Sequence, residues 1–168
     1  AAGGRYPIVL GAVNRGIAET DAPFLLLLNS DAELQAGALT ALAGYLREHQ
    51  ETAAAGAQLF KPDGRIQHAV DVFPTLVTEL VNKGLLRRLW PSRYPSRLQA
   101  RTEPCEVDSL IGACMMIRRA AVDSVGGLDP RFFVFYEETD WCLRARRAGW
   151  RIVLVPEARA VHGQGEPK

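Results

Sequence analysis

The sequence has few cysteines and no long apolar run, and each shortage excludes a class of protein. Its 168 residues include three cysteines, Cys105, Cys114 and Cys142, without a C-x-x-C pair, so neither a disulfide framework nor a thiolate zinc site is indicated. No apolar run approaches the roughly 20 residues of a membrane-spanning helix, and we expect neither a membrane span nor a signal peptide. A net charge of +1 argues against a protein built mainly to bind nucleic acid. We therefore expect one soluble domain with free, buried thiols in a reducing compartment.

Acidic residues are absent between Glu79 and Glu103, and six basic side chains lie in that interval. With apolar residues at helical spacing from Leu76 onward, residues 76–104 are predicted to form a basic amphipathic insertion. Such a segment could lie on an anionic membrane surface or hold a diphosphate. A solvated helix followed by a mobile loop explains the same pattern, and we favour this simpler interpretation because charge runs are more often solvated faces than sites.

The strongest structural signal is the apolar run Phe24–Leu28, which Asn29, Ser30 and Asp31 follow directly. Apolar residues without polar interruption predict a parallel strand that is buried on both faces. Ligands of α/β sheets bind in crevices at the carboxyl ends of the strands, so Asp31 is a candidate site residue. An equally good explanation is that Asn29, Ser30 or Asp31 caps the helix predicted over residues 36–49.

The rest of the pattern alternates short apolar runs with helical spacing, which predicts an α/β domain. The expected elements are a strand at Pro7–Leu10, a helix at Gly11–Asp21, a hairpin of Ala53–Phe60 and Ile66–Val70 around a Pro-Asp-Gly turn, a core segment at Val107–Ile117, a helix at Ala120–Val125 closed by Gly126-Gly127, a helix that starts at Glu137 and ends before Gly149, and a strand at Arg151–Val155 ended by Pro156.

Three acids, Glu137, Glu138 and Asp140, open the helix that follows an aromatic loop. Acids at the start of a helix and arginines at its end complement the helix dipole, so these acids could serve helix stability alone. Their number and position favour a second role, because a partly desolvated carboxylate has its pKa raised toward the working range of a general base. His162 is a further candidate, although a lone histidine is more often structural than a ligand.

Several motifs occur in one order along residues 11–165. They are an apolar strand ending in Asn-Ser-Asp-Ala, a Gly-Ala segment followed by Arg-Arg and a helix, Gly-Gly-Leu-Asp-Pro-Arg-Phe-Phe, an acidic pair opening a helix, Ala-Gly-Trp-Arg, and Val-His-Gly. In this order they resemble the motifs of glycosyltransferase family 2, and the similarity is greatest to the bacterial rhamnosyltransferase-like branch that builds cell-envelope polysaccharide.

The resemblance implies a GT-A fold, in which helices flank a mixed, Rossmann-like α/β sheet, within a single domain over residues 1–168. It implies an inverting transfer of a sugar, rhamnose among the candidates, from a dTDP- or UDP-sugar donor to a hydroxyl of a cell-envelope glycan or lipid-linked acceptor. It also implies Mg²⁺ or Mn²⁺ as cofactor and a cytoplasmic location, at the inner face of the plasma membrane if the basic insertion contacts lipid. The strand–helix–strand unit that holds the nucleoside in this family has no counterpart before Gly11, so the domain is expected to be amino-terminally truncated.

Roles for single residues follow from the same resemblance. Asp31 matches the metal-binding aspartate of the family's Asp-x-Asp motif, in which Asn29 replaces the first aspartate, and His162 matches a late histidine that helps to bind the metal or diphosphate. Glu138 stands at the position of the catalytic base, which is more commonly an aspartate. The other implied site residues are the supporting acids Glu137 and Asp140 and the donor- and acceptor-binding residues Asn14, Arg15, Asn29, Ser30, Gly112, Ala113 and Trp141.

Two alternatives from other classes stay open. A non-catalytic remnant would bind carbohydrate or acceptor without transfer, and failure to bind any nucleoside diphosphate with metal would favour it. A peripheral membrane-binding module would rest on the basic stretch, which liposome sedimentation tests. Glycoside hydrolysis is formally possible too, because the chain contains enough acids for a pair of catalytic carboxylates.

Overall fold

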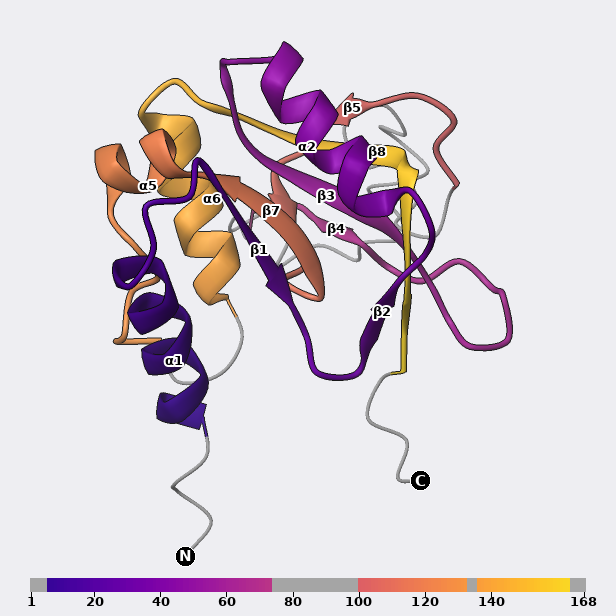
Figure 1. Ribbon diagram of the computed structural model, residues 1–168, viewed down its shortest axis with the longest axis horizontal. Coiled ribbons are helices and arrows are strands. Elements are labelled where there is room, and N and C mark those ends of the chain that lie inside the picture. The colour runs from indigo at the N-terminus through magenta and orange to yellow at the C-terminus, as the bar shows by residue number, and fades with distance from the viewer. Residues whose placement is uncertain (1–5, 74–99, 133–135, 164–168) are drawn as a thin grey trace, which may run out of the picture.

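The central sheet of the molecule is mixed and collects strands from distant parts of the chain (Figure 1). The computed structural model describes residues 6–73, 100–132 and 136–163. The six strands of this sheet are β1 (Phe24–Leu28), β2 (Ala32–Leu34), β3 (Thr52–Phe60), β5 (Cys105–Glu106), β7 (Cys114–Arg118) and β8 (Arg151–His162). Five follow the order β1-β7-β3-β8-β2, and β5 pairs with β8 outside this path. The predicted α/β class is confirmed.

The described residues also contain a small second sheet and four helices. The second sheet pairs two short strands, and its members and the helices are β4 (Val70–Asp71), β6 (Ser109–Leu110), α1 (Tyr6–Ala18), α2 (Ala38–Glu48), α5 (Arg119–Val125) and α6 (Glu137–Arg147). Figure 1 shows α2 lying across β3 and β8, while α5 packs against β7 and α6, and α6 also contacts β6 and β8.

The core is centred on β3 and β8, which run parallel to each other. β3 is buried from Thr52 to Leu59 and consists largely of alanine and glycine, so neighbouring elements can approach its backbone closely. Gly56 shows this directly, because a Cβ there would overlap the side chain of Leu110. On α2, Leu42 and Leu46 are completely buried, and burial of each stabilises the fold by about 1.5–3 kcal/mol.

The prediction for Phe24–Leu28 is right about the strand and wrong about its surroundings. β1 pairs antiparallel with β7 and with no other strand among the described residues, so it lies at an edge of the sheet. Its first four residues are half-buried, and Leu28 is exposed. An unbroken apolar run does not distinguish a central parallel strand from an edge strand, because it reports hydrophobicity and not the number or direction of neighbours.

Two boundary predictions are wrong as well. Residues 7–10 lie in α1 instead of a strand, since proline is tolerated in the first turn of a helix and a short apolar run fits either element. β8 continues past Pro156 to His162, and its pairing with β3 jumps from Ala57↔Val155 to Gln58↔Arg159. The irregularity accommodates a proline that cannot donate a hydrogen bond, and the extended strand carries His162 to a position opposite Ala32 of β2.

The segment Val107–Ile117 is also divided. β6 and β7 are separate strands, and Gly112 and Ala113 form the turn between them. The Pro-Asp-Gly turn is confirmed, with the Lys61 N–H donating to the Arg65 carbonyl at 2.8 Å, but the pairing of the expected hairpin is reduced to an isolated bridge and one further hydrogen bond. The helices predicted over residues 36–49, 120–125 and from Glu137 are confirmed within a few residues, and Gly126 has the positive φ of a helix-closing glycine.

The thiols agree with expectation, because all three cysteines are free. Burial raises the pKa of both Cys114 and Cys142 to about 11, which keeps these thiols protonated and unreactive. Within the described part of the chain, no helix is both long and apolar enough to cross a bilayer. The predicted basic insertion lies almost wholly in residues 74–99, outside the described residues.

Candidate functional site

Polar residues meet at the end of the sheet where β1 and β8 finish and β7 begins (Figure 1). We call this end of the sheet the site edge. The Asn29 N–H donates to the Ala113 carbonyl at 3.1 Å, which ties the end of β1 to the turn before β7. On the other side, Ala32 pairs with His162, and the Gly163 N–H donates to the Asp31 carbonyl at 2.9 Å. The Asn-Ser-Asp segment is therefore held between the Gly112-Ala113 turn and the end of β8.

Asp31 and His162 face each other across this edge. The His162 Nε2 atom lies 3.2 Å from Oδ1 of Asp31, with the histidine side chain 12% exposed and the aspartate side chain 39% exposed. Asn29 Nδ2 is 3.4 Å from the same Nε2. The capping alternative for this segment is wrong, because the N-cap of α2 is Gly37 and no side chain caps that helix.

The donor set at this edge suits a divalent cation shared with a substrate. Carboxylate oxygen and imidazole nitrogen are ligands that Mn²⁺ accepts, and Mg²⁺ favours the oxygen. No group of three or more His, Cys, Asp or Glu residues that could enclose a metal ion occurs in the described ranges. Asp31 and His162 are thus two candidate ligands, and a cation held by them would need further ligands from substrate oxygens and water. Gln67 contacts His162 through its Nε2 atom, and its buried Oε1 has no hydrogen-bond partner among the described atoms. One polar atom beside the pair could therefore still accept a hydrogen bond.

Glu138 lies in the first turn of α6, directly against Gly112. A Cβ at Gly112 would overlap the Glu138 carboxylate, so a larger residue there would displace this carboxylate from its present position. Burial, followed by the nearby charge of Glu137, raises the pKa of Glu138 to about 7, against opposing hydrogen bonds from the backbone N–H groups of Glu138 and Gly112. A carboxyl that titrates near neutral pH is suited to take up and release a proton.

Glu138 contacts Gly112, and the next residue, Ala113, accepts a hydrogen bond from Asn29 in the loop that bears Asp31. The Gly112-Ala113 turn therefore connects Glu138 to the Asp31–His162 pair. The structure thus brings Asn29, Asp31, Gly112, Glu138 and His162 to the site edge. Ser30 lies in the same loop and is exposed, while Ala113 is buried and contributes its carbonyl. Glu137 adds a buried Oε2 that has no partner among the described residues.

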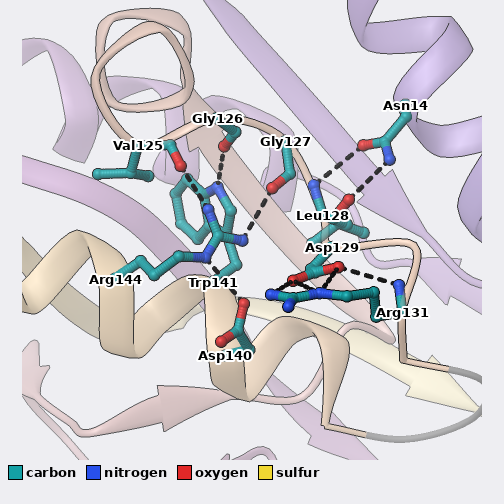
Figure 2. Close-up of polar contacts among 10 residues, drawn as sticks. All are labelled: Asn14, Val125, Gly126, Gly127, Leu128, Asp129, Arg131, Asp140, Trp141 and Arg144. Atoms are coloured by element: carbon teal, nitrogen blue, oxygen red, sulfur yellow. Dashed lines mark hydrogen bonds and ion pairs between the residues drawn. The ribbon is translucent and has the colours of Figure 1, made fainter.

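Three of the other predicted site residues, Asn14, Asp140 and Trp141, hold the loop between α5 and α6 (Figure 2). Asn14 donates to the Leu128 carbonyl at 2.7 Å and accepts from the Leu128 N–H at 2.9 Å. Trp141 is buried, and its indole N–H donates to the Gly126 carbonyl at 2.9 Å. Both side chains are thus engaged with backbone, and their contact with a ligand stays a prediction.

Asp140 and Arg144 complete this loop clamp. Asp140 pairs with Arg144 at 2.8 Å, and the same guanidinium donates to the carbonyls of Val125 and Gly127 (Figure 2). Arg15 lies apart from it, exposed and paired with Glu19 at 2.6 Å one turn along α1. The structure brings neither Asp140 nor Arg15 next to the Asp31–His162 pair. The role of Arg15 in donor binding and that of Asp140 in supporting the base stay predictions.

A pocket beside α6 was not predicted from the sequence. Its volume is about 260 Å³, and it is lined by Phe73, Phe132, Tyr136, Thr139, Asp140 and Leu143. Four of these residues fall at positions i, i+3, i+4 and i+7 of one helix face, which is a sequence signal that could have revealed it. Tyr136 is exposed and has φ 72°, the one positive φ of a non-glycine residue in the described ranges, and such strain clusters at functional sites. No pattern in the sequence pointed to Gln67, which contacts His162.

The mixed α/β sheet with its flanking helices is a fold of the GT-A type. The family described as "Glycosyltransferase like family 2" matches residues 9–167, and the chain belongs to this family. The predicted fold and family are confirmed, and so is the similarity to rhamnosyltransferases.

Two curated relatives show how far this similarity reaches. N-acetylglucosaminyl-diphospho-decaprenol L-rhamnosyltransferase of Mycobacterium tuberculosis is 32% identical over 144 residues, which cover 83% of this chain and 46% of the relative. Rhamnosyltransferase WbbL of Escherichia coli K12 is 26% identical over 157 residues, covering 92% of this chain and 58% of the relative. The chain therefore spans about half the length of these relatives.

A solved structure confirms the fold by geometry. GalNAc-T7, crystallised with UDP, GalNAc and Mn²⁺, superposes with a TM-score of 0.62 at 16% sequence identity, and the match covers 92% of this chain and 30% of GalNAc-T7. At this identity the likeness concerns the fold alone.

Proposed function

We propose that this chain carries the metal- and acceptor-side half of an inverting glycosyltransferase. One observation carries the proposal: Glu138, whose pKa is raised to about 7, sits on Gly112 at the sheet edge that also holds Asp31 and His162. A proton acceptor and a cation-type ligand pair are the two groups that an in-line displacement of a diphosphate requires. Family membership supports the same reaction class.

Glu138 would act as the general base. Its carboxylate accepts the proton of an acceptor hydroxyl while that oxygen attacks the anomeric carbon, and the bond from this carbon to the diphosphate oxygen breaks. A single displacement inverts the anomeric centre. Gly112 positions the carboxylate by leaving room for it and by donating its N–H.

Asp31 and His162 would hold Mg²⁺ or Mn²⁺. When bound, the cation supplies positive charge that offsets the charge developing on the leaving diphosphate. The chain would contribute Asp31, directly before β2, and His162, at the end of the neighbouring β8, and the Ala32↔His162 pairing and the Gly163–Asp31 hydrogen bond fix their positions. Asn29, within reach of His162, contributes no charge, so binding of the cation would depend strongly on the diphosphate.

The relatives suggest the substrate class. Since two of them are named as rhamnosyltransferases, one acting on a decaprenol diphosphate, we propose a dTDP- or UDP-activated sugar such as rhamnose as donor and a lipid-linked glycan as acceptor. The apolar pocket beside α6 adjoins the first turn that bears Glu138 and would receive the acceptor. Such an acceptor would place the protein in the cytoplasm at the inner face of the plasma membrane.

Calorimetric titration with dTDP and UDP, with and without Mn²⁺, tests the proposal. We expect metal-dependent binding that Asp31→Ala abolishes, whereas Glu33→Ala, an exposed acid two residues away, leaves it unchanged. Glu138→Gln should retain this binding and lose sugar transfer. Binding that ignores both Mn²⁺ and Asp31 would refute the proposed metal site, and metal-dependent binding with no transfer by wild type would favour the non-catalytic alternative.

A further inference from the structure

Gln67 is a buried polar residue that the proposed mechanism leaves without a role. It is 4% exposed, and its Nε2 atom lies 2.8 Å from Nδ1 of His162. Its backbone N–H donates to the Leu59 carbonyl at 2.9 Å, which fixes it beside β3. The imidazole is therefore held from both sides, by Gln67 at Nδ1 and by Asp31 at Nε2.

The orientation of the Gln67 amide and the ring nitrogen that carries the proton depend on each other. A neutral imidazole has one N–H donor and one lone pair. When the Gln67 amide N–H donates to Nδ1, the proton is on Nε2 and points at the Asp31 carboxylate. In this arrangement Oε1 of Gln67 is buried and has no hydrogen-bond partner among the described residues.

A half-turn of the amide exchanges the positions of its oxygen and nitrogen. Oε1 then accepts the proton of Nδ1–H and gains the partner that it lacks, and Nε2 presents a lone pair beside Asp31. An amide suits both arrangements because it is a donor and an acceptor, whereas a carboxylate can only accept. Metal-bound histidines usually donate their second N–H to such an oxygen.

We propose that Gln67 is a positioning residue that sets the tautomer of His162. Its amide donates to Nδ1 in the cation-free protein and accepts from Nδ1 when Nε2 and Asp31 bind a divalent cation. The second half of this inference rests on the proposed function, and the first half does not.

Imidazole ¹⁵N NMR of the cation-free, 168-residue chain tests the first half, at a pH where the rings are neutral. The chain has three histidines, and the half-exposed His49, which lies beside Glu51, serves as an internal reference. We expect the Nε2–H tautomer of His162 in wild type and the Nδ1–H tautomer in Gln67→Glu, with the His49 signals unchanged. The same tautomer in both proteins would overturn the proposal.

Titration with Mn²⁺ in the presence of UDP, followed by electron paramagnetic resonance, tests the second half. Gln67→Leu should bind Mn²⁺ about 10- to 100-fold more weakly than wild type, and Gln67→Glu should restore the affinity to within a few-fold. Equal affinity of wild type and Gln67→Leu would overturn the role in cation binding. If wild type binds no Mn²⁺, the proposed metal site fails, while the tautomer result still decides what Gln67 does. If Gln67→Leu does not fold, Mn²⁺ binding by Gln67→Glu that is 10-fold or more weaker than in wild type would overturn the second half, because a carboxylate can accept the Nδ1 proton.

Discussion

Replacing Glu138 with glutamine should stabilise the protein in a pH-dependent manner. The pKa of this carboxyl rises from its ordinary 4.5 to about 7 in the folded chain, first through burial and second through the charge of Glu137. Between these two pH values the folded protein keeps a proton that the unfolded chain loses. The free energy of unfolding therefore falls as the pH rises through this window.

The size of the effect follows from the same pKa. One pKa unit corresponds to about 1.36 kcal/mol, so the rise to about 7 costs about 3 kcal/mol of stability above neutral pH. Glu138→Gln removes this cost, because the amide cannot ionise. We expect wild type and variant to have similar stability at low pH and to diverge by up to about 3 kcal/mol above pH 7, equivalent to about 6–12 °C in Tm.

Urea unfolding of both proteins at several pH values below and above neutrality measures this divergence. Glu157→Gln, which changes an exposed glutamate of β8, is the matched control and should follow wild type at every pH. Sugar transfer by wild type should rise with pH through about 7, as the carboxylate becomes available. A stability difference between wild type and Glu138→Gln that does not change with pH would refute the reasoning.

Three further substitutions test the surroundings of this acid. Gly112→Ala forces a Cβ into the Glu138 carboxylate, so it should lower the free energy of unfolding in urea by about 1–3 kcal/mol and abolish transfer. Gly44→Ala, at an open helical position, is the control and should stabilise the fold by about 0.5–1 kcal/mol. Equal effects of the two substitutions would contradict the proposed contact. Trp141→Phe leaves the Gly126 carbonyl without its donor, so it should lower the free energy of unfolding by about 1–3 kcal/mol without weakening nucleotide binding. A loss of nucleotide affinity at unchanged stability would show instead that the indole contacts the ligand. Asn14→Ala removes two hydrogen bonds and should lower the free energy of unfolding by about 1–3 kcal/mol, with the donor affinity measured by calorimetry unchanged. Weaker donor binding at unchanged stability would instead support the predicted contact of Asn14 with the nucleotide.

The sequence predicts elements well where one physical cause acts alone. The spacing of Leu42 and Leu46 implies a helix with one buried face, and α2 has this form. At Gly112 the structure shows what the sequence does not, a close approach of the Glu138 side chain. Pro156 misleads, because the missing N–H ends a regular strand but is tolerated in an irregular one, and only the pairing with β3 reveals the irregularity.

Contacts between distant residues are harder to predict. Gln67 and His162 are separated by 95 positions, and neither side chain has a pattern that points to the other. Asn14 meets Leu128 over an even longer interval. Motif order placed Asn14 in the candidate site, but the choice between ligand and loop depends on where its two amide atoms point, which a single sequence does not contain.

The acids at the start of α6 lie in different surroundings, and among the described residues only one of them has an ion-pair partner on its own helix. Asp140 is paired with Arg144 and thereby helps to hold the helix against the α5–α6 loop. Glu138 lies in the same turn, where the helix dipole favours negative charge, yet burial beside Glu137 costs about 3 kcal/mol. Hydrogen bonds to charged groups contribute about 1.5–3 kcal/mol each, so the Arg144 contacts with Asp140 and the loop carbonyls are large enough to offset that cost. A destabilising acid can persist at this edge because the same helix is anchored one turn further along.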